Sequence, residues 1–256
     1  MTDDITISID DRIQRIVFSR PAKKNALTAA MYGAATEAVR AADSDPRIGA
    51  TVLTGEGDFF TAGNDLGEFL SGLGRAGDAA PPPIAFLLAL VNAEKPVLAS
   101  VNGPAVGIGL TMLLHCDYVL AAEDAFLHAP FIDLGLTPEG GSSLLLPRLL
   151  GRRLAGEILL LGERIPAPRA AALGLVNRAV PRAELEAQTG EVAARIAAKA
   201  PEALRRAKEL MLGDRQEIIA CIDRERRIFA DRLQSAEFKE AATAFLEKRP
   251  PDFARN

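Results

Sequence analysis

The sequence predicts an α/β fold, in which a largely buried and mostly parallel sheet is followed by a C-terminal helical region. Short runs of continuous apolar residues alternate with helical segments over the first 181 residues, a pattern typical of parallel strands covered on both faces. After this point the character changes, because helical periodicity dominates from residue 182 onward. A chain of 256 residues is long enough to bury a sizeable core.

The first elements are two strand-like runs, residues 5–9 and 12–19, whose short charged connection predicts a β-hairpin. Thr28 then opens an Ala-rich helical segment that extends to about residue 43. The Gly- and Pro-rich residues 73–83 form the clearest loop. Further β-type runs are found at residues 48–54, 97–101, 118–121 and 176–180.

We therefore expect an α/β core over residues 1–181 and a C-terminal helical region over residues 182–256, divided at Pro201 and Gly213. A helical region of this length is expected to pack on the core or on another subunit rather than to fold alone. Within it, the alternating Arg and Glu of residues 224–227 are interpreted as a solvated helix face or a subunit contact.

Composition and charge exclude several classes of function. The net charge of −4 gives no reason to expect a nucleic-acid partner. Cys116 and Cys221 lack metal-binding spacing, so we expect no metal. The acidic N-terminus has no apolar run typical of a signal peptide, which predicts a cytoplasmic location. Residues 96–116 are uncharged and long enough for a membrane span, but the Asn-Gly-Pro at 102–104 interrupts them, so we expect no membrane.

Two turns that follow strands could supply main-chain N–H donors. The first is Phe-Phe-Thr-Ala-Gly-Asn-Asp-Leu at residues 59–66, and the second is Asn-Gly-Pro-Ala-Val-Gly-Ile-Gly-Leu-Thr at residues 102–111. Small residues let a ligand approach the main chain, and a helix N-terminus carries free N–H groups. One donor from each turn could form an oxyanion hole, although a Gly-rich turn of this kind, taken alone, more often has a structural role. A dinucleotide site is disfavoured, because Met112 replaces the last glycine of G-x-G-x-x-G.

A third segment, residues 128–143, contains the candidate acid–base residues. Glu139 stands between a proline and two glycines where a helix is about to begin. It is either a carboxylate favoured at a helix N-terminus or a general base at the mouth of a pocket. Asp133 is the rival carboxylate, and its simpler interpretation is a loop or surface residue. His128 is interpreted as a hydrogen-bonded structural residue and His115 as a satisfied buried side chain.

In this order and spacing, the segments resemble the crotonase superfamily, that is, the enoyl-CoA hydratase/isomerase family. The resemblance covers nearly the whole chain, from Arg-Pro-Ala-Lys-Lys-Asn-Ala-Leu at residues 20–27 to Phe-Leu-Glu-Lys-Arg-Pro-Pro-Asp-Phe at residues 245–253. It implies a crotonase-like (ClpP/crotonase) fold of repeated ββα units and an acyl-CoA thioester substrate. Coenzyme A is part of that substrate, so no separate cofactor is expected. The resemblance also implies a homotrimer or hexamer, with the C-terminal helical region taking part in trimerisation.

The resemblance further assigns the site. It implies that the N–H groups of Ala62 and Ile108 form the oxyanion hole beside Glu139. Residues 73–83 and the helix after them would set the depth of the acyl pocket. The residues expected to contact the substrate or its coenzyme, the last two of them in the same or a neighbouring subunit, are Lys24, Ala26, Ala62, Gly63, Asn64, Asp65, Leu66, Gly107, Phe131, Lys248 and Phe253.

Departures from the family pattern bear on the reaction. Typical hydratases use two glutamates, and Thr111 and Phe131 stand at those positions here, which disfavours ordinary hydration. The segments around residues 102–108 and 130–140 closely resemble the Δ3,Δ2-enoyl-CoA isomerase branch, in which the glutamate of Pro-Glu-Gly, here Glu139, is the base. A double-bond shift from C3 to C2 is therefore the expected activity. The alternatives are an enoyl-CoA hydratase or another acyl-CoA lyase-type enzyme that uses Asp133 or Glu139 differently, and a non-catalytic CoA-binding module.

Overall fold

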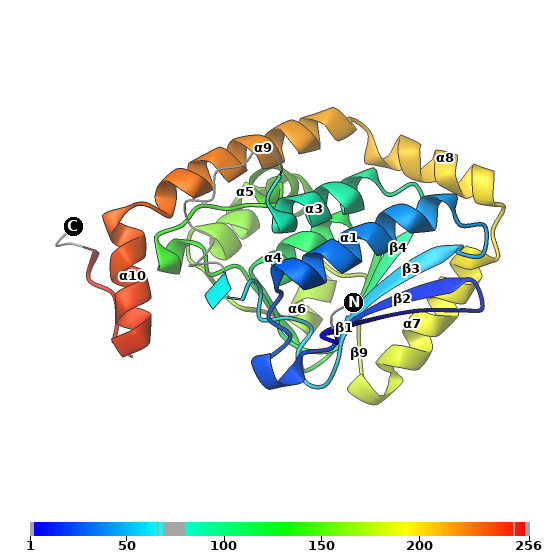
Figure 1. Cartoon of the computed structure of the whole chain (residues 1–256), viewed down its shortest axis with the longest axis horizontal. Coiled ribbons are helices and arrows are strands. Elements are labelled where there is room, and N and C mark those ends of the chain that lie inside the picture. The colour runs from blue at the N-terminus through cyan, green and yellow to red at the C-terminus, as the bar shows by residue number, and fades with distance from the viewer. Residues whose placement is uncertain (1–2, 66, 69–79, 248, 254–256) are drawn as a thin grey trace.

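The computed structural model describes residues 3–65, 67–68, 80–247 and 249–253. Its main element is a six-stranded sheet with the strand order β1-β2-β3-β4-β6-β9 (Figure 1). The first two strands pair antiparallel and every other neighbouring pair is parallel. The predicted hairpin and the mostly parallel sheet are therefore confirmed. The strands are β1 (Ile5–Asp10), β2 (Ile13–Phe18), β3 (Ala50–Gly55), β4 (Val97–Val101), β6 (Tyr118–Ala122) and β9 (Arg178–Val180).

A second, three-stranded sheet is formed by β5 (Ala105–Val106), β7 (Phe126–His128) and β8 (Ile165–Pro166). β4 and β6 are each followed by one short strand of this sheet and then by a helical turn, which gives the ββα repeat. The helical elements of this part are η1 (Pro21–Lys23), α4 (Ile108–Thr111), η2 (Met112–His115), η3 (Ile132–Leu134), α5 (Ser142–Leu159) and α6 (Ala167–Ala172).

Helices cover both faces of the large sheet. Residues of α1 (Ala29–Ser44) and α3 (Pro82–Asn92) belong to the apolar cluster that contains Leu53, whereas Val192 and Ala193 of α7 (Arg182–Ala197) belong to the cluster that contains Val52. Neighbouring residues of a strand point to opposite faces of a sheet. α1 and α7 therefore lie on opposite faces, and the sheet is buried between them.

The helix α1 begins where the sequence predicts. Thr28 has extended backbone angles, and its side chain accepts a hydrogen bond from the N–H of Met31 at 3.3 Å. A cap of this kind typically contributes about 1 kcal/mol. Met31, Ala35 and Val39, spaced four residues apart on one helix face, are all buried. The same face carries Tyr32 inward, toward the candidate site.

The helical region after residue 181 packs on the core of its own chain. α7 lies on the large sheet, α9 (Arg215–Arg232) contacts α3 and α5, and α10 (Ala236–Glu247) contacts η3. Figure 1 shows α9 extending across the helical side of the molecule toward α10. The segment that supplies α9 therefore reaches the start of α5, beside Glu139.

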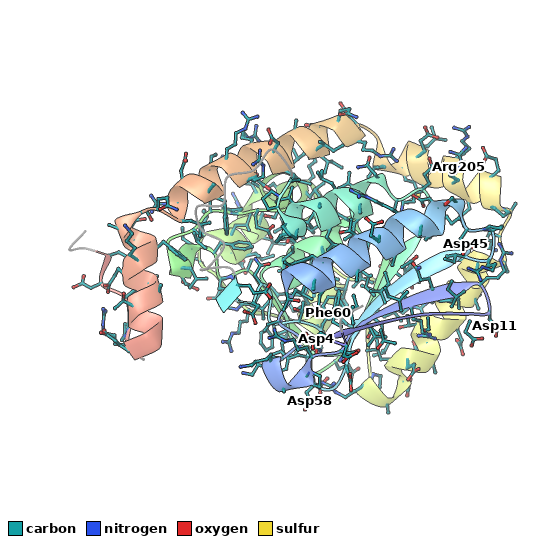
Figure 2. All side chains as sticks on the ribbon, viewed as in Figure 1. Asp4, Asp11, Asp45, Asp58, Phe60 and Arg205 are labelled. Carbon is teal, nitrogen blue, oxygen red and sulfur yellow. The ribbon has the colours of Figure 1, made fainter. Side chains whose placement is uncertain are left out.

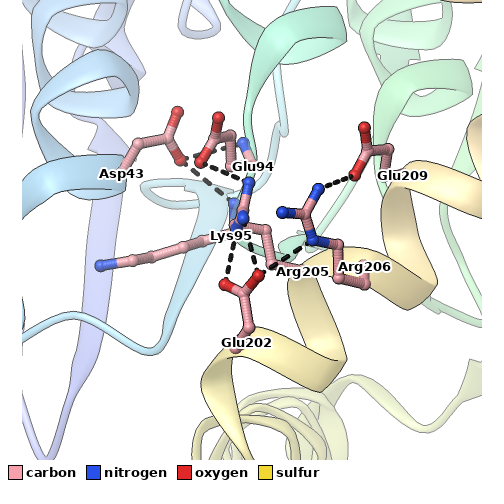
Figure 3. A network of polar contacts seen from close by, with 7 residues as sticks. All are labelled: Asp43, Glu94, Lys95, Glu202, Arg205, Arg206 and Glu209. Carbon is pink, nitrogen blue, oxygen red and sulfur yellow. Dashed lines mark hydrogen bonds and ion pairs between the residues drawn. The ribbon is translucent and has the colours of Figure 1, made fainter.

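Polar contacts attach α8 (Pro201–Leu212) to the residue before β6 and to the turn before β4. Lys208 is 9% exposed, and its Nζ lies 2.7 Å from Asp117 Oδ2. Figure 3 shows the neighbouring network, in which Arg205 bonds Glu202 at 2.8 Å and reaches Glu94 at 3.5 Å. Exposed pairs of this kind contribute about 0–1 kcal/mol. The buried lysine is the more important anchor, because removal of its partner would leave an uncompensated charge.

Apolar side chains anchor the first candidate turn to the core. Phe60 is fully buried and packs edge-to-face on Phe18 with a ring separation of 5.7 Å. Figure 2 shows Phe60 within the body of the molecule, whereas Asp11 and Asp58 lie at its periphery. Among the described helices, none is both long and apolar enough to cross a membrane.

Candidate active site

In the first turn, the N–H group predicted for the oxyanion hole is already hydrogen-bonded within the chain. The N–H of Ala62 donates to the carbonyl of Lys24 at 2.9 Å. A peptide N–H that is already paired with a carbonyl cannot also hold a substrate oxygen without losing that bond. The expectation that Ala62 supplies a free donor is therefore wrong in this structure. The direction of the Ala62 N–H is fixed by its hydrogen bond to the carbonyl of Lys24, and no local pattern in residues 59–66 reveals that bond.

Asn64 carries the free N–H of this turn. Leu27 donates to the carbonyl of Gly63 at 2.8 Å and accepts from the N–H of Asp65 at 2.9 Å. In this parallel bridge the N–H of Asn64 faces away from Leu27, and it has no hydrogen-bond acceptor among the described residues. Tyr32 fixes the side chain, because its hydroxyl donates to Asn64 Oδ1 at 2.5 Å.

The second turn is joined directly to the first. Thr61 donates to the carbonyl of Pro104 at 3.2 Å and accepts from the N–H of Val106 at 3.0 Å. Gly109 allows the close approach, since a Cβ at this position would lie 2.7 Å from Thr61 Cγ2. The predicted meeting of the two turns is therefore confirmed at Thr61 and Ala105.

Ile108 is the first residue of α4, and Gly107 precedes it with φ 59°. The N–H of Gly107 donates to the carbonyl of His128 at 2.8 Å. The N–H of Ile108 has no acceptor in the described part of the chain, as expected for the first turn of a helix. Asn64 and Ile108 therefore each present an unused donor from one of two adjoining turns.

Glu139 is buried in the turn that precedes α5. Glu139 is only 8% exposed, and its Oε1 accepts a hydrogen bond from Thr111 Oγ1 at 2.5 Å. Gly140 and Gly141 both adopt positive φ, at 70° and 79°. A Cβ at Gly140 would lie 2.9 Å from Thr111 Oγ1, so the glycine is needed for the close approach. Ser142 closes the turn, because its hydroxyl donates to the carbonyl of Glu139 at 2.6 Å.

The surroundings of Glu139 make it a stronger base than an exposed carboxylate. Burial raises the pKa of Glu139 most, the hydrogen bond from Thr111 lowers it, and the negative charge of Glu225 raises it, which gives a pKa of about 7. The pKa of Tyr32 is also raised, first by burial and then by the charge of Glu139. Tyr32 also donates a hydrogen bond to Asn64, so it connects the carboxylate of Glu139 to the first turn.

The sequence matches the model of the enoyl-CoA hydratase/isomerase family over residues 8–256. The chain belongs to this family. The predicted membership in the crotonase superfamily, whose members act on acyl-CoA thioesters, is thereby confirmed.

Relatives in the family differ in reaction. Enoyl-CoA delta isomerase 2 of Rattus norvegicus is 36% identical over 251 residues, which are 96% of this chain but 64% of that protein. This chain therefore spans less than two thirds of that relative. The 2,3-dehydroadipyl-CoA hydratase of Escherichia coli K12 is 34% identical over 98% of both chains. A crystal structure of an enoyl-CoA hydratase/isomerase from Pseudoalteromonas atlantica T6c is 41% identical, with a TM-score of 0.93, over 98% of this chain and all of that chain, which confirms the crotonase-like fold.

Several residues expected to contact the coenzyme or acyl group have structural partners within the chain. Lys24 is exposed, and its Nζ lies 5.2 Å from the centre of the Phe59 ring. Asp65 pairs with Arg20 at 2.7 Å, which holds the pKa of Asp65 below its usual range. The carbonyl of Ala26 also accepts from Arg20, at 3.1 Å.

Positions farther along the chain complete the comparison with the sequence. Phe131 is buried and packs edge-to-face on Phe229 at 6.4 Å. Phe253 is 37% exposed. Leu66, Lys248 and residues 73–79 of the expected loop lie outside the described residues, so their predicted roles stay predictions.

The other titratable candidates lie outside the chemistry of Glu139. Asp133 is exposed, as its simpler interpretation predicts. His115 is buried with Nε2 2.7 Å from the carbonyl of Gly140, which confirms the predicted satisfied buried side chain, and burial lowers its pKa to about 4. His128 is partly buried, and its pKa is lowered first by burial and then by the charge of Arg164. In the described part of the chain, no three His, Cys, Asp or Glu side chains gather as a metal site would require.

Two residues of the site escaped the sequence interpretation. Tyr32 stands within an ordinary apolar helix face, where no local signal separates it from a core residue. The sequence predicts a solvated helix face or a subunit contact for residues 224–227, yet Glu225 is only 5% exposed and bonds the start of α5 in its own chain. The expectation for Glu225 is wrong because α9 turns this position toward the N-terminus of α5.

Proposed function

We propose that this chain shifts a double bond in an enoyl-CoA thioester from C3 to C2, with Glu139 as the base. The supporting observation is a buried carboxylate with a pKa of about 7, which is hydrogen-bonded to Thr111 at a position where a hydratase would have a glutamate. A group that titrates near neutral pH can both accept and return a proton. Phe131, at the other hydratase glutamate position, is apolar and buried.

In the proposed reaction the carboxylate of Glu139 removes a proton from C2. The C–H electron pair becomes the C1–C2 double bond of a dienolate, in which the C3–C4 double bond is still present, and the carbonyl π pair moves onto the thioester oxygen. The carbonyl then re-forms as the oxygen gives its pair back, the C1–C2 pair becomes the C2–C3 double bond, and the former C3–C4 π pair takes the proton from Glu139 to form the new C4–H bond. No proton is gained or lost overall, and no water is consumed.

The enolate oxygen is held, in this proposal, by the N–H groups of Asn64 and Ile108, with Asn64 replacing Ala62 in the predicted pair. Both are unused donors in the described part of the chain, and the Thr61 bridge joins the turns that carry them. Loss of one such donor typically costs about 3–4 kcal/mol in transition-state stabilisation. Pairing of the Ala62 N–H with Lys24 is the reason for this reassignment.

Product analysis tests the proposal directly. Wild-type protein is incubated separately with a 3-enoyl-CoA and a 2-enoyl-CoA, and the same assays are run with Glu139→Gln. We expect 2-enoyl-CoA from the first substrate and a loss of about 100- to 10,000-fold in the variant. Asp133→Asn is the matched control, because it removes an exposed carboxylate from the same segment and should keep wild-type activity.

Hydration is the second candidate, favoured by the relative that is named a hydratase and matches along its whole length. Formation of a 3-hydroxyacyl-CoA from the 2-enoyl substrate, persisting in Glu139→Gln, would assign hydration instead. Binding of either substrate without turnover would identify a CoA-binding module.

The assembly is also a proposal. A homotrimer or hexamer would cover some of the large apolar side chains that one chain leaves exposed, among them Leu160 and Leu161 at 71% and 67%. Light scattering on the purified protein would give three or six times the 27.2 kDa chain mass; the mass of a monomer or dimer would contradict it.

A further inference from the structure

Glu225 is a buried carboxylate at the N-terminus of a helix to which it does not belong. It lies on α9, yet Oε2 accepts from the N–H of Gly141 at 2.5 Å and Oε1 accepts from the N–H of Ser143 at 2.9 Å. No Lys, Arg or His side chain among the described residues forms an ion pair with it. Its burial is therefore offset by the free N–H groups and the positive end of α5.

The helix α5 lacks a cap of its own. Its N-cap residue is Gly141, which has no side chain to accept a bond from the first turn. The orphan N–H groups of a helix start need an acceptor when they are buried. Glu225 supplies that acceptor from α9, where it follows Gly141 by 84 residues and Ser143 by 82 residues.

The capped turn is the one that carries Glu139. Gly140 and Gly141 are both in the left-handed region, so this backbone has little intrinsic preference for the observed shape. Ser142 ties the carbonyl of Glu139 to the helix start, and Glu225 holds the N–H groups on either side of Ser142. A displacement of Gly141 would therefore move Glu139 relative to Thr111.

We propose that Glu225 is a positioning residue for Glu139, which holds the turn at residues 139–143 and whose negative charge strengthens Glu139 as a base. The effect on the reaction rate rests on the proposed isomerase function, whereas the effects on the turn and on the charge do not. The groups that face Glu139 are Thr111 from α4, Tyr32 from α1 and Glu225 from α9, and the neutral ring of His115 binds the next carbonyl. Among these groups, Glu225 is the one whose charge acts on Glu139, because the raised pKa of Tyr32 keeps its hydroxyl neutral near pH 7.

Rate measurements against pH separate positioning from a merely structural role. Glu225→Gln removes the charge and one acceptor oxygen; we expect the plateau kcat for a 3-enoyl-CoA to fall about tenfold, since small misplacements of a catalytic group are costly. The midpoint of the acid limb should move below 7, because a negative neighbour is lost. Glu225→Asp keeps the charge on a shorter side chain, so its plateau should fall while its midpoint stays near 7.

Asp223→Asn is the matched control, because it removes a carboxylate two residues away that pairs with Arg226 and Arg227 at the surface. Its plateau and midpoint should equal those of the wild type. A wild-type plateau in both Glu225 variants would overturn the proposal, as would an unmoved midpoint in Glu225→Gln. If Glu225→Gln does not fold, as judged by circular dichroism, the Glu225→Asp plateau decides the result.

A second readout is independent of turnover. Carbon-13 NMR of glutamate carboxyl groups, with Glu139 assigned from its absence in Glu139→Gln, gives its titration midpoint in wild type and in Glu225→Gln. We expect a lower midpoint in the variant, and equal midpoints would overturn the proposed effect of the charge. If the wild type does not convert a 3-enoyl-CoA, the proposed function fails, yet this titration still tests Glu225.

Discussion

Thr111→Val isolates the hydrogen bond that Thr111 donates to Glu139. The two side chains are nearly the same shape, and Thr111 is fully buried, so the change removes a hydroxyl without opening a cavity. The lost contact joins Thr111 Oγ1 to Glu139 Oε1 at 2.5 Å. This bond lowers the pKa of Glu139, so its loss should raise that pKa above about 7.

The size of the effect follows from the kind of bond. A hydrogen bond to a charged group contributes about 1.5–3 kcal/mol, equal to roughly a 10- to 100-fold change in proton affinity. A carboxyl with a midpoint of about 7 is half ionised at pH 7. In the variant only about 1–10% would be ionised, so kcat at pH 7 should fall about 5- to 50-fold. Because the base is still present, activity should recover as the pH rises.

The assay is kcat for isomerisation of a 3-enoyl-CoA between pH 5 and 10, and the control is Thr111→Ser, which keeps the hydroxyl. We expect the acid limb of Thr111→Val to move to higher pH and that of Thr111→Ser to stay near 7. The reasoning is refuted if the limb of Thr111→Val is unmoved or moves to lower pH, or if its activity does not recover at high pH. Glu225→Gln should shift the limb in the opposite direction.

Three further predictions concern stability and the turn. The pKa of Glu139 is about 7 in the folded state, above its ordinary 4.5. The stability contributed by its neutral form is therefore complete below pH 4.5 and is lost as the pH rises through 7. Glu139→Gln should raise the free energy of unfolding in urea by about 3 kcal/mol at pH 8 and change it little at pH 4. An equal effect at both values would contradict this. Gly140→Ala should lower the Tm by several degrees, since φ is 70° and the new Cβ would be crowded. Gly156→Ala, inside α5, should not lower it, because the new Cβ would meet only Leu160 Cδ1 at 3.8 Å, an ordinary contact. A Tm for Gly140→Ala equal to that of the wild type would show that the turn tolerates a side chain. Tyr32→Phe removes the 2.5 Å bond to Asn64, so it should cost about 1 kcal/mol of stability in thermal or urea unfolding and reduce kcat/KM about tenfold. An unchanged kcat/KM would contradict the proposed role of Asn64 in the oxyanion hole.

Local signals in the sequence are sufficient for much of the fold and for the candidate base. The hairpin follows from two β-type runs and a charged turn, and the start of α1 follows from Thr28, because capping is decided within a few residues. Glu139 is marked by its position between a proline and two glycines, and both glycines adopt positive φ in the structure. The parallel sheet follows from strands that are apolar on both faces.

Contacts between distant segments explain the errors. The direction of the Ala62 N–H is set by a bond to Lys24, and that of the Asn64 N–H by the bridge to Leu27, so a shift of two residues in a turn could not be detected from the turn itself. Glu225 has charged neighbours in sequence, which predict solvent exposure. Its burial depends on how α9 meets α5, and periodicity does not encode that contact.

Transfer of a labelled proton tests most directly whether one buried carboxylate carries the proton between the two carbons. A 3-enoyl-CoA deuterated at C2 is converted in ordinary water under single-turnover conditions, and the 2-enoyl product is examined by NMR. With Glu139 only 8% exposed, we predict that a measurable fraction of the deuterium appears at C4. A product without deuterium at C4, or a hydrated product in its place, would contradict proton transfer by Glu139.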